Sequence, residues 1–147
     1  MEKLYDDLIM DHIKNARNFG ALDDANHKAR GFNPLCGDDL TVYIRVERDR
    51  IESIAFQCTC CGVSMASASI MTESLRGRPT AEAKVLIPEF VAVLNRRADP
   101  SGQVGDPGQT AILATVREFP ARTRCAVLPW LALEAALDDR QDVVVER

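Results

Sequence analysis

Apolar residues at the start of the chain recur with the period of a helix. Leu4, Leu8 and His12 lie four residues apart, and this spacing places them on one face of a helix over residues 2–15. A histidine on an apolar helix face is more often a packed or capping residue than a metal ligand. We therefore expect His12 to belong to the packed face of this helix.

The period then changes to that of strands. Residues 41–47 place only branched aliphatic side chains on one face: Val42, Ile44 and Val46. A short polar turn separates this predicted strand from a second one over 51–58. Ile51 is out of phase with Ile54, which predicts a bulge or a late start. Two strands joined by a short turn predict an antiparallel hairpin.

Helical patterns return in the second half of the chain. We expect helices over 62–76, 80–96 with a break near Pro88, 110–118 and 126–138. Gly77 is a typical C-terminal stop for the first of them. Pro129 is tolerated if it falls in the first turn of the last helix. Residues 98–110 have the glycine and proline content of a loop.

Composition limits the classes of protein to consider. The chain has 147 residues, 46% of them hydrophobic and 27% charged, which predicts a single domain over 1–147 with a flexible tail at about 140–147. The net charge of −4 disfavours nucleic acid as a partner. No apolar run is long enough for a membrane span, and the N-terminus lacks the pattern of a secretory signal. We therefore expect a cytoplasmic protein.

Five cysteines are the main candidates for chemistry. In a reducing compartment they are expected to be ligands or nucleophiles rather than disulfides. The chain has no pair of C-x-x-C motifs, so zinc fingers and zinc ribbons do not fit. Neither histidine has the context of a catalytic base, which disfavours a cysteine protease.

The places of three cysteines in the predicted elements support a role as ligands or nucleophiles. Cys61 and Cys125 each precede a predicted helix, where partial positive charge favours the thiolate. Cys36 lies with Asp38 in a predicted tight turn. Cys58 and Cys60 are explained equally well as small buried side chains.

Four segments carry the motifs of one protein family. They are D-H-x-x-N-A-R-N-F-G at residues 11–20, N-P-L-C-G-D at 33–38, S-M-A-S-A-S-I-M-T-E at 64–73 and F-P-A-R-T-R-C-A-V-L-P-W at 119–130. With these motifs the chain resembles the IscU/NifU-type iron–sulfur cluster assembly proteins, and their SufU branch most closely. The resemblance covers nearly the whole chain, and an insert at about 97–112 is similar to that branch.

The resemblance implies an α+β fold in which a small antiparallel three-stranded sheet packs against several helices, as in SufE/NifU-like and IscU-like proteins. Residues 28–35 would form the first strand. It also implies Zn²⁺ on four ligands: Cys36, Asp38, Cys61 and Cys125. SufU-type proteins take persulfide sulfur from a SufS-like cysteine desulfurase. Other cluster assembly proteins and apo acceptors are the further partners implied.

The chemistry of the donors agrees with that ligand set. Zinc accepts thiolate and carboxylate ligands in a tetrahedron. Arg122 and Arg124 flank Cys125, and either could offset the negative charge of the site. The carboxylate of Asp38 should exchange more readily than a thiolate. Sulfur transfer needs a free thiolate, and we expect Cys36 to be the acceptor because a loop can move toward a partner.

Departures from the family pattern leave alternatives open. Arg124 replaces the histidine of the IscU branch, and residues 119–123 lack its L-P-P-V-K motif. Both differences favour the hypothesis of a SufU-type sulfur acceptor over that of an IscU-type cluster scaffold. Cys58 and Cys60 replace two glycines, and they could compete as ligands, relay sulfur or only fill space. The alternatives are a scaffold for a labile [2Fe–2S] cluster or iron on the same ligands, and a binding module with a structural zinc. Whether the chain is an enzyme stays open.

Overall fold

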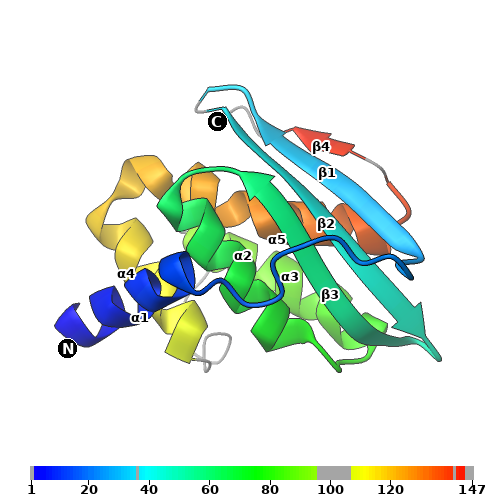
Figure 1. Cartoon of the computed structure of the whole chain (residues 1–147). Helices are drawn as coiled ribbons and strands as arrows, with labels where there is room; N and C mark the ends of the chain where they lie inside the picture. Colours follow the sequence, from blue (N-terminus) through cyan, green and yellow to red (C-terminus); the bar gives the residue numbers. More distant parts are fainter. Residues whose placement is uncertain (1, 36, 96–106, 141, 145–147) are drawn as a thin grey trace.

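Three strands lie between the first helix and the remaining helices along the chain (Figure 1). The computed structural model describes residues 2–35, 37–95, 107–140 and 142–144. Within them the elements are α1 (Glu2–Lys14), β1 (His27–Asn33), β2 (Asp38–Glu47), β3 (Arg50–Thr59), α2 (Gly62–Leu75), α3 (Thr80–Leu94), α4 (Pro107–Glu118), the 3₁₀ turn η1 (Pro120–Arg122), α5 (Thr123–Leu137) and β4 (Asp142–Val144).

The sheet confirms the three antiparallel strands and extends them by one. Its strand order is β3-β2-β1-β4, and the short β4 pairs with β1 in parallel. We expected a flexible tail at about 140–147; within this range residues 142–144 form β4. Val143 and Val144 favour a strand, and the edge of β1 offers them backbone hydrogen-bonding groups.

The β2–β3 hairpin contains the predicted irregularity. Arg45 pairs with Ser53 and Val46 pairs with Ile51, so the register shifts between these two steps. The extra residue on β3 lets both Ile51 and Ile54 face the core, where both are buried. The out-of-phase position of Ile51 in the sequence is thereby explained.

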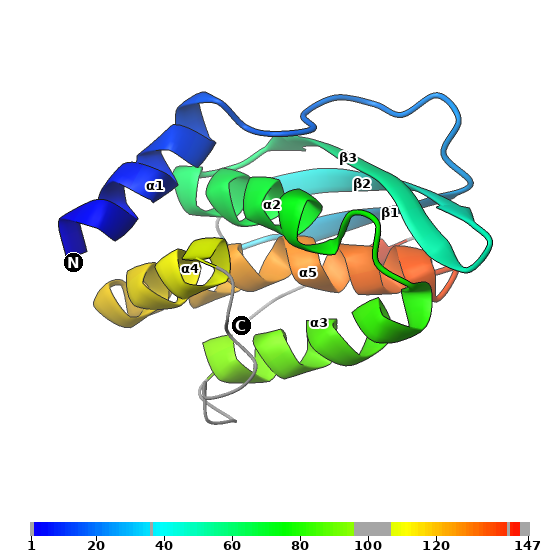
Figure 2. The same cartoon turned by 90° about the horizontal axis from the view of Figure 1, so that it is seen from below.

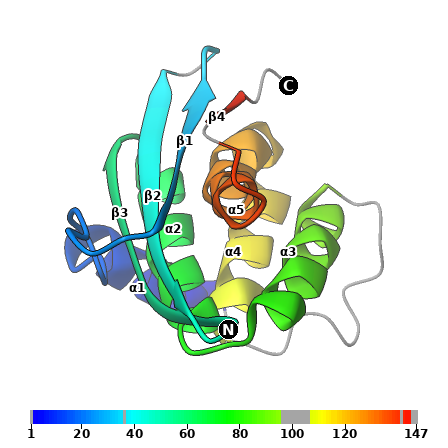
Figure 3. The ribbon, with the colours of Figure 1, turned by 90° about the vertical axis from the view of Figure 1, so that its right-hand side faces the viewer.

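One face of the sheet is covered by two helices, and a second helical layer lies outside them. Figures 2 and 3 show α2 and α5 against the sheet, with α3 and α4 beyond. Gly31 of β1 allows the close approach of α5, because an added Cβ would lie 3.1 Å from a side-chain carbon of Leu128 and 3.2 Å from Ala132. The small residues of α2 have the same effect, and Ser67 and Ala68 are fully buried.

Three helices differ from their predicted bounds. The expected break in α3 is wrong, because the helix continues through Pro88. One lost hydrogen bond is offset there by the burial of apolar neighbours such as Ile87. The helix expected at 110–118 begins at Pro107, a residue type suited to a first turn. Residues 96–106, most of the expected insert, lie outside the described residues.

The last helix begins earlier than predicted. We expected it over 126–138, but η1 leads directly into α5 at Thr123. Cys125 therefore lies inside the first turn of α5 rather than before it, and Pro129 lies in the helix interior.

None of the described helices combines the length and the apolar content that a membrane crossing would need.

Candidate metal centre

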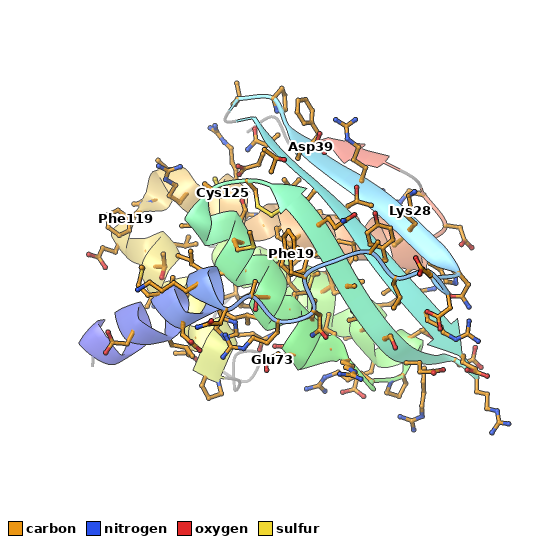
Figure 4. The ribbon with its side chains drawn as sticks, in the orientation of Figure 1. Phe19, Lys28, Asp39, Glu73, Phe119 and Cys125 are labelled. Carbon is orange, nitrogen blue, oxygen red and sulfur yellow. A yellow bond between two sulfur atoms is a disulfide. The ribbon has the colours of Figure 1, made fainter. Side chains whose placement is uncertain are left out.

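Three distant segments bring possible metal ligands together at one end of the sheet (Figure 1). Asp38 is the first residue of β2, Cys61 directly precedes α2, and Cys125 lies in the first turn of α5. One ligand atom from each residue lies within 4.8 Å of the others. Figure 4 labels Cys125 at this end of the molecule. Cys36, the fourth predicted ligand, lies outside the described residues.

Asp38 is held by the strand rather than by a loop. The sequence predicted a turn at this residue, but Asp38 pairs with Asn33 across the β1–β2 ladder. Its side chain faces the core and is 3% exposed. The backbone N–H of Cys61 donates to Asp38 Oδ1 at 2.9 Å. This bond fixes the carboxylate beside the start of α2.

Cys61 is the N-cap residue of α2, as predicted. Hydrogen bonds lower the pKa of the Cys61 thiol to about 5: the bond from Cys125 is the largest cause, and the backbone N–H and hydroxyl of Ser64 add to it. Cys61 Sγ lies 3.8 Å from Asp38 Oδ2. At neutral pH a thiolate and a carboxylate therefore lie side by side, which favours a bound cation.

Cys125 takes the opposite protonation state. Its hydrogen bond to Cys61 raises the pKa of the Cys125 thiol, and burial adds to this effect. The hydrogen bond with Cys125 is also the main cause of the raised pKa of Arg122. Of the two arginines that we expected to offset the charge, Arg122 is the one that this interaction places at the site.

Ser64 is a site residue that sequence analysis missed. Its hydroxyl oxygen is fully buried, 2.7 Å from Asp38 Oδ2 and 3.0 Å from the backbone oxygen of Cys125. The hydroxyl has one proton, so it donates to one of these acceptors at a time. Pro129 has no N–H to donate to the carbonyl four residues earlier, which is that of Cys125. In the sequence, Ser64 could have been found from its spacing: it lies three residues after Cys61, close enough to the start of the helix to contact the N-cap residue.

The other two cysteines form a disulfide. Cys58 and Cys60 are joined with their Cα atoms 5.5 Å apart, which is a usual separation. Our expectation that the cysteines are ligands or nucleophiles rather than disulfides is wrong for this pair in the state described. Residues two apart on an extended chain point to the same side, which brings the two sulfurs together.

His12 has the packed role that the sequence predicted. It is 3% exposed, and its Nδ1 lies 2.7 Å from Ser69 Oγ on α2. The histidine thus joins α1 to α2 away from the cysteines.

The donor set fits a thiophilic metal ion. Two sulfurs and one carboxylate oxygen are ligands that zinc accepts, and a tetrahedral zinc site spaces its ligand atoms about 3.8 Å apart. The separations of up to 4.8 Å need only a small inward movement of the side chains. Iron is compatible with the same donors.

The chain is similar to several known proteins. The family described as NifU-like N terminal domain matches residues 4–126. The zinc-dependent sulfurtransferase SufU of Bacillus subtilis is 37% identical over 135 residues, which are 91% of this chain and 89% of that protein. The iron-sulfur cluster assembly scaffold protein IscU of Streptococcus pyogenes is 33% identical over 137 residues, 93% and 84% of the two chains.

A solved structure supports the fold. It is described as an iron-sulfur cluster assembly scaffold protein for the SUF system from Fervidobacterium islandicum AW-1, and it superposes with a TM-score of 0.80 at 29% identity. The match covers 92% of this chain and 98% of that one. The chain belongs to the NifU-like N-terminal domain family of iron–sulfur cluster assembly proteins.

Proposed function

We propose that this chain accepts persulfide sulfur from a cysteine desulfurase and that Cys36, Asp38, Cys61 and Cys125 hold a zinc ion. The observation that carries the proposal is the convergence of Asp38, Cys61 and Cys125 within 4.8 Å from three separate elements. The name of the Bacillus subtilis relative, a zinc-dependent sulfurtransferase, supports the choice of metal and of reaction.

Each residue of the centre has a role in this reaction. When bound, zinc keeps its coordinating sulfurs as thiolates and protects them from oxidation. The Cys36 thiolate attacks the terminal sulfur of the desulfurase persulfide, forming a new S–S bond while the desulfurase cysteine leaves as a thiolate. Asp38, the only oxygen donor, exchanges more readily than the thiolates. Arg122 offsets the negative charge of the centre.

The partners follow from the same chemistry. The sulfur donor is a SufS-like cysteine desulfurase, and the recipients are other cluster assembly proteins and apo acceptors. No contact with nucleic acid or with a membrane is part of this function.

Metal analysis and a sulfur-transfer assay test the proposal together. We expect one tightly bound zinc per chain in freshly purified protein and faster desulfurase turnover when the protein is added. With the Cys58–Cys60 disulfide intact, the Cys36→Ala variant should accept no labelled sulfur, whereas Leu35→Ala, a matched change at the preceding residue, should still accept it. Normal labelling of Cys36→Ala would show that another residue is the acceptor.

A scaffold for a labile [2Fe–2S] cluster is the second candidate. The name of the Streptococcus pyogenes relative favours it, and the cluster would be cargo on the same donors. Anaerobic reconstitution with iron and sulfide should then give visible absorbance and transfer of the cluster to an apo protein. Failure to hold a cluster, together with stimulation of a desulfurase, would eliminate this candidate.

A further inference from the structure

The disulfide lies directly beside the candidate metal centre. Cys60 is bonded in sequence to Cys61, and Cys58 lies near the end of β3. Asp39 pairs with Thr59, so the end of β3 lies beside the start of β2, where Asp38 is the first residue. The backbone N–H of Cys61 donates to Asp38 Oδ1 at 2.9 Å. The disulfide is therefore one peptide bond away from a candidate ligand that contacts a second one.

The disulfide contributes little to the stability of the fold. Stabilisation by a cross-link grows with the length of chain that it closes, and this one spans a sequence separation of 2. The strand around Cys58 is already held by its ladder to β2. Both cysteines are only partly buried, so solvent reactants can reach them. These features are typical of a reactive disulfide rather than a structural one.

Filling space does not require two sulfurs. Cys58 Sγ contacts Met65 Sδ at 3.9 Å on the inner side of β3, a contact that any small apolar side chain could make. Cys60 comes after the last residue of the strand and before Cys61. The pairing of the two thiols beside the metal centre is the feature that needs a chemical explanation.

We propose that Cys58 and Cys60 form a dithiol–disulfide pair that reduces sulfane sulfur at the neighbouring metal centre and releases it as sulfide. The proposal rests on the function proposed above, because it needs persulfide sulfur to reach this end of the molecule. It adds a reductive step to sulfur acceptance, so that the chain delivers sulfide as well as persulfide.

Over one turnover, atoms and electrons balance without a further reactant. The Cys60 thiolate attacks the outer sulfur of an incoming persulfide, and the original carrier leaves as a thiolate. The Cys58 thiolate then attacks Cys60 Sγ, which forms the disulfide and expels hydrosulfide. The sulfane sulfur gains two electrons, and the two thiolates lose them. A small dithiol reductant regenerates the pair by ordinary thiol–disulfide exchange.

A single-turnover experiment tests this assignment. The full chain is loaded with zinc, reduced, freed of reductant and mixed with one equivalent of cysteine persulfide. Released sulfide is measured by colorimetry, and the state of each cysteine is measured by peptide mass spectrometry after alkylation. We expect sulfide from the wild-type chain together with a Cys58–Cys60 disulfide. The Cys58→Ser variant should release none above the protein-free blank and should retain sulfur on Cys60.

Control variants separate the possible outcomes. Met65→Leu keeps the packing against Cys58 but brings no thiol, and it should release as much sulfide as the wild type. Zinc content and urea unfolding show whether Cys58→Ser is folded. Equal sulfide release by wild type and a folded Cys58→Ser variant would overturn the reductive role while leaving sulfur acceptance intact. Absence of any sulfur uptake by the wild-type chain would overturn both proposals.

Discussion

One shared proton sets the chemistry of the two cysteines at the centre. The hydrogen bond between Cys125 and Cys61 lowers the pKa of Cys61 and raises that of Cys125. The metal-free centre therefore already holds one thiolate at neutral pH. Of these two cysteines, only Cys125 has to lose a proton on metal binding, which reduces the pH dependence of binding relative to two ordinary thiols at these positions.

Removing the donor should restore an ordinary thiol at Cys61. In the Cys125→Ala variant we expect the pKa of Cys61 to rise from about 5 toward 9.0, because the thiolate loses its main hydrogen bond. Cys125→Ser keeps a hydroxyl donor and should retain part of the lowering. Ultraviolet absorbance of the thiolate in metal-free protein measures both. Equal pKa values in Cys125→Ala and wild type would contradict this account.

The same pair makes the stability of the metal-free protein depend on pH. Between about pH 5 and pH 9 the folded chain has a thiolate at Cys61 where the unfolded chain has a thiol. The unfolded state then binds one more proton, so stability rises with pH across this window. Above about pH 9 the unfolded chain loses the Cys125 proton that the folded chain keeps, and stability falls.

Urea unfolding of wild type and of Cys125→Ala at a series of pH values tests this dependence. The difference between their free energies of unfolding should follow the stated rise and fall. A difference that does not change between pH 5 and pH 9 would rule out the shared proton.

The two arginines beside Cys125 should differ in their effect on the metal. Arg122 interacts with Cys125 and with the charge of Cys61, so Arg122→Gln should weaken zinc binding by about 10- to 100-fold. Arg124→Gln is the matched control and should change it little. Competition with a chromophoric chelator measures both affinities. An equal loss in the two variants would indicate a general charge effect.

Among the elements, α2 and α5 are linked at the centre by the contact between the Ser64 hydroxyl and the backbone carbonyl of Cys125, and Pro129 of α5 makes this contact possible. Pro129 has no N–H to donate to the carbonyl of Cys125, and the Ser64 hydroxyl lies 3.0 Å from this oxygen. The same hydroxyl lies 2.7 Å from Asp38 Oδ2. A break in the hydrogen bonding of one helix therefore provides the site where a second helix and a strand meet.

A double-mutant cycle measures this coupling. Ser64→Ala should lower the free energy of unfolding by about 1–3 kcal/mol, because buried acceptors lose a donor. In the Pro129→Ala background a backbone N–H can replace the hydroxyl at Cys125, and the cost of Ser64→Ala should fall by about 1 kcal/mol. Strict additivity of the two changes would show that Ser64 and Pro129 act independently. Urea denaturation provides the values.

At the scale of the whole molecule, the centre joins elements that the core already holds together. The core runs from the sheet through α2 and α5 to α3 and α4 (Figure 3). Trp130 is fully buried and donates from Nε1 to Ser67 Oγ, which links α5 to α2. The fold therefore has a source of stability that does not depend on a metal.

Chelation should accordingly destabilise the protein without unfolding it. If zinc is present at about 100 times its Kd, its removal costs about 2.7 kcal/mol, which corresponds to a fall in Tm of about 5–10 °C for a chain of this size. Far-ultraviolet circular dichroism at room temperature should stay unchanged. Complete loss of helical signal on chelation would instead support the alternative of a binding module with a structural zinc.

Local pattern was a good guide to some elements and a poor one to others. The period of apolar residues predicted α1 and the β2–β3 hairpin with its bulge, because each buries one face. It missed β1, where Asn33-Pro34 reads as a turn and Gly31 provides no apolar side chain. Gly31 is a glycine because α5 lies against it, and this packing is not visible in a local pattern.

The residue types present, the positions of most helices and strands and the resemblance to a family follow from the order of residues, because these depend on local spacing and short motifs. Which groups meet follows from the packing of the folded chain. Asp38, Cys61 and Cys125 are far apart along the chain, so only the packing of β2, α2 and α5 sets their separation. It also decided that Ser64 joins the site and that Cys125 keeps its proton while Cys61 does not. Hydrogen bonds and burial depend on neighbours in space, which the order of residues does not specify.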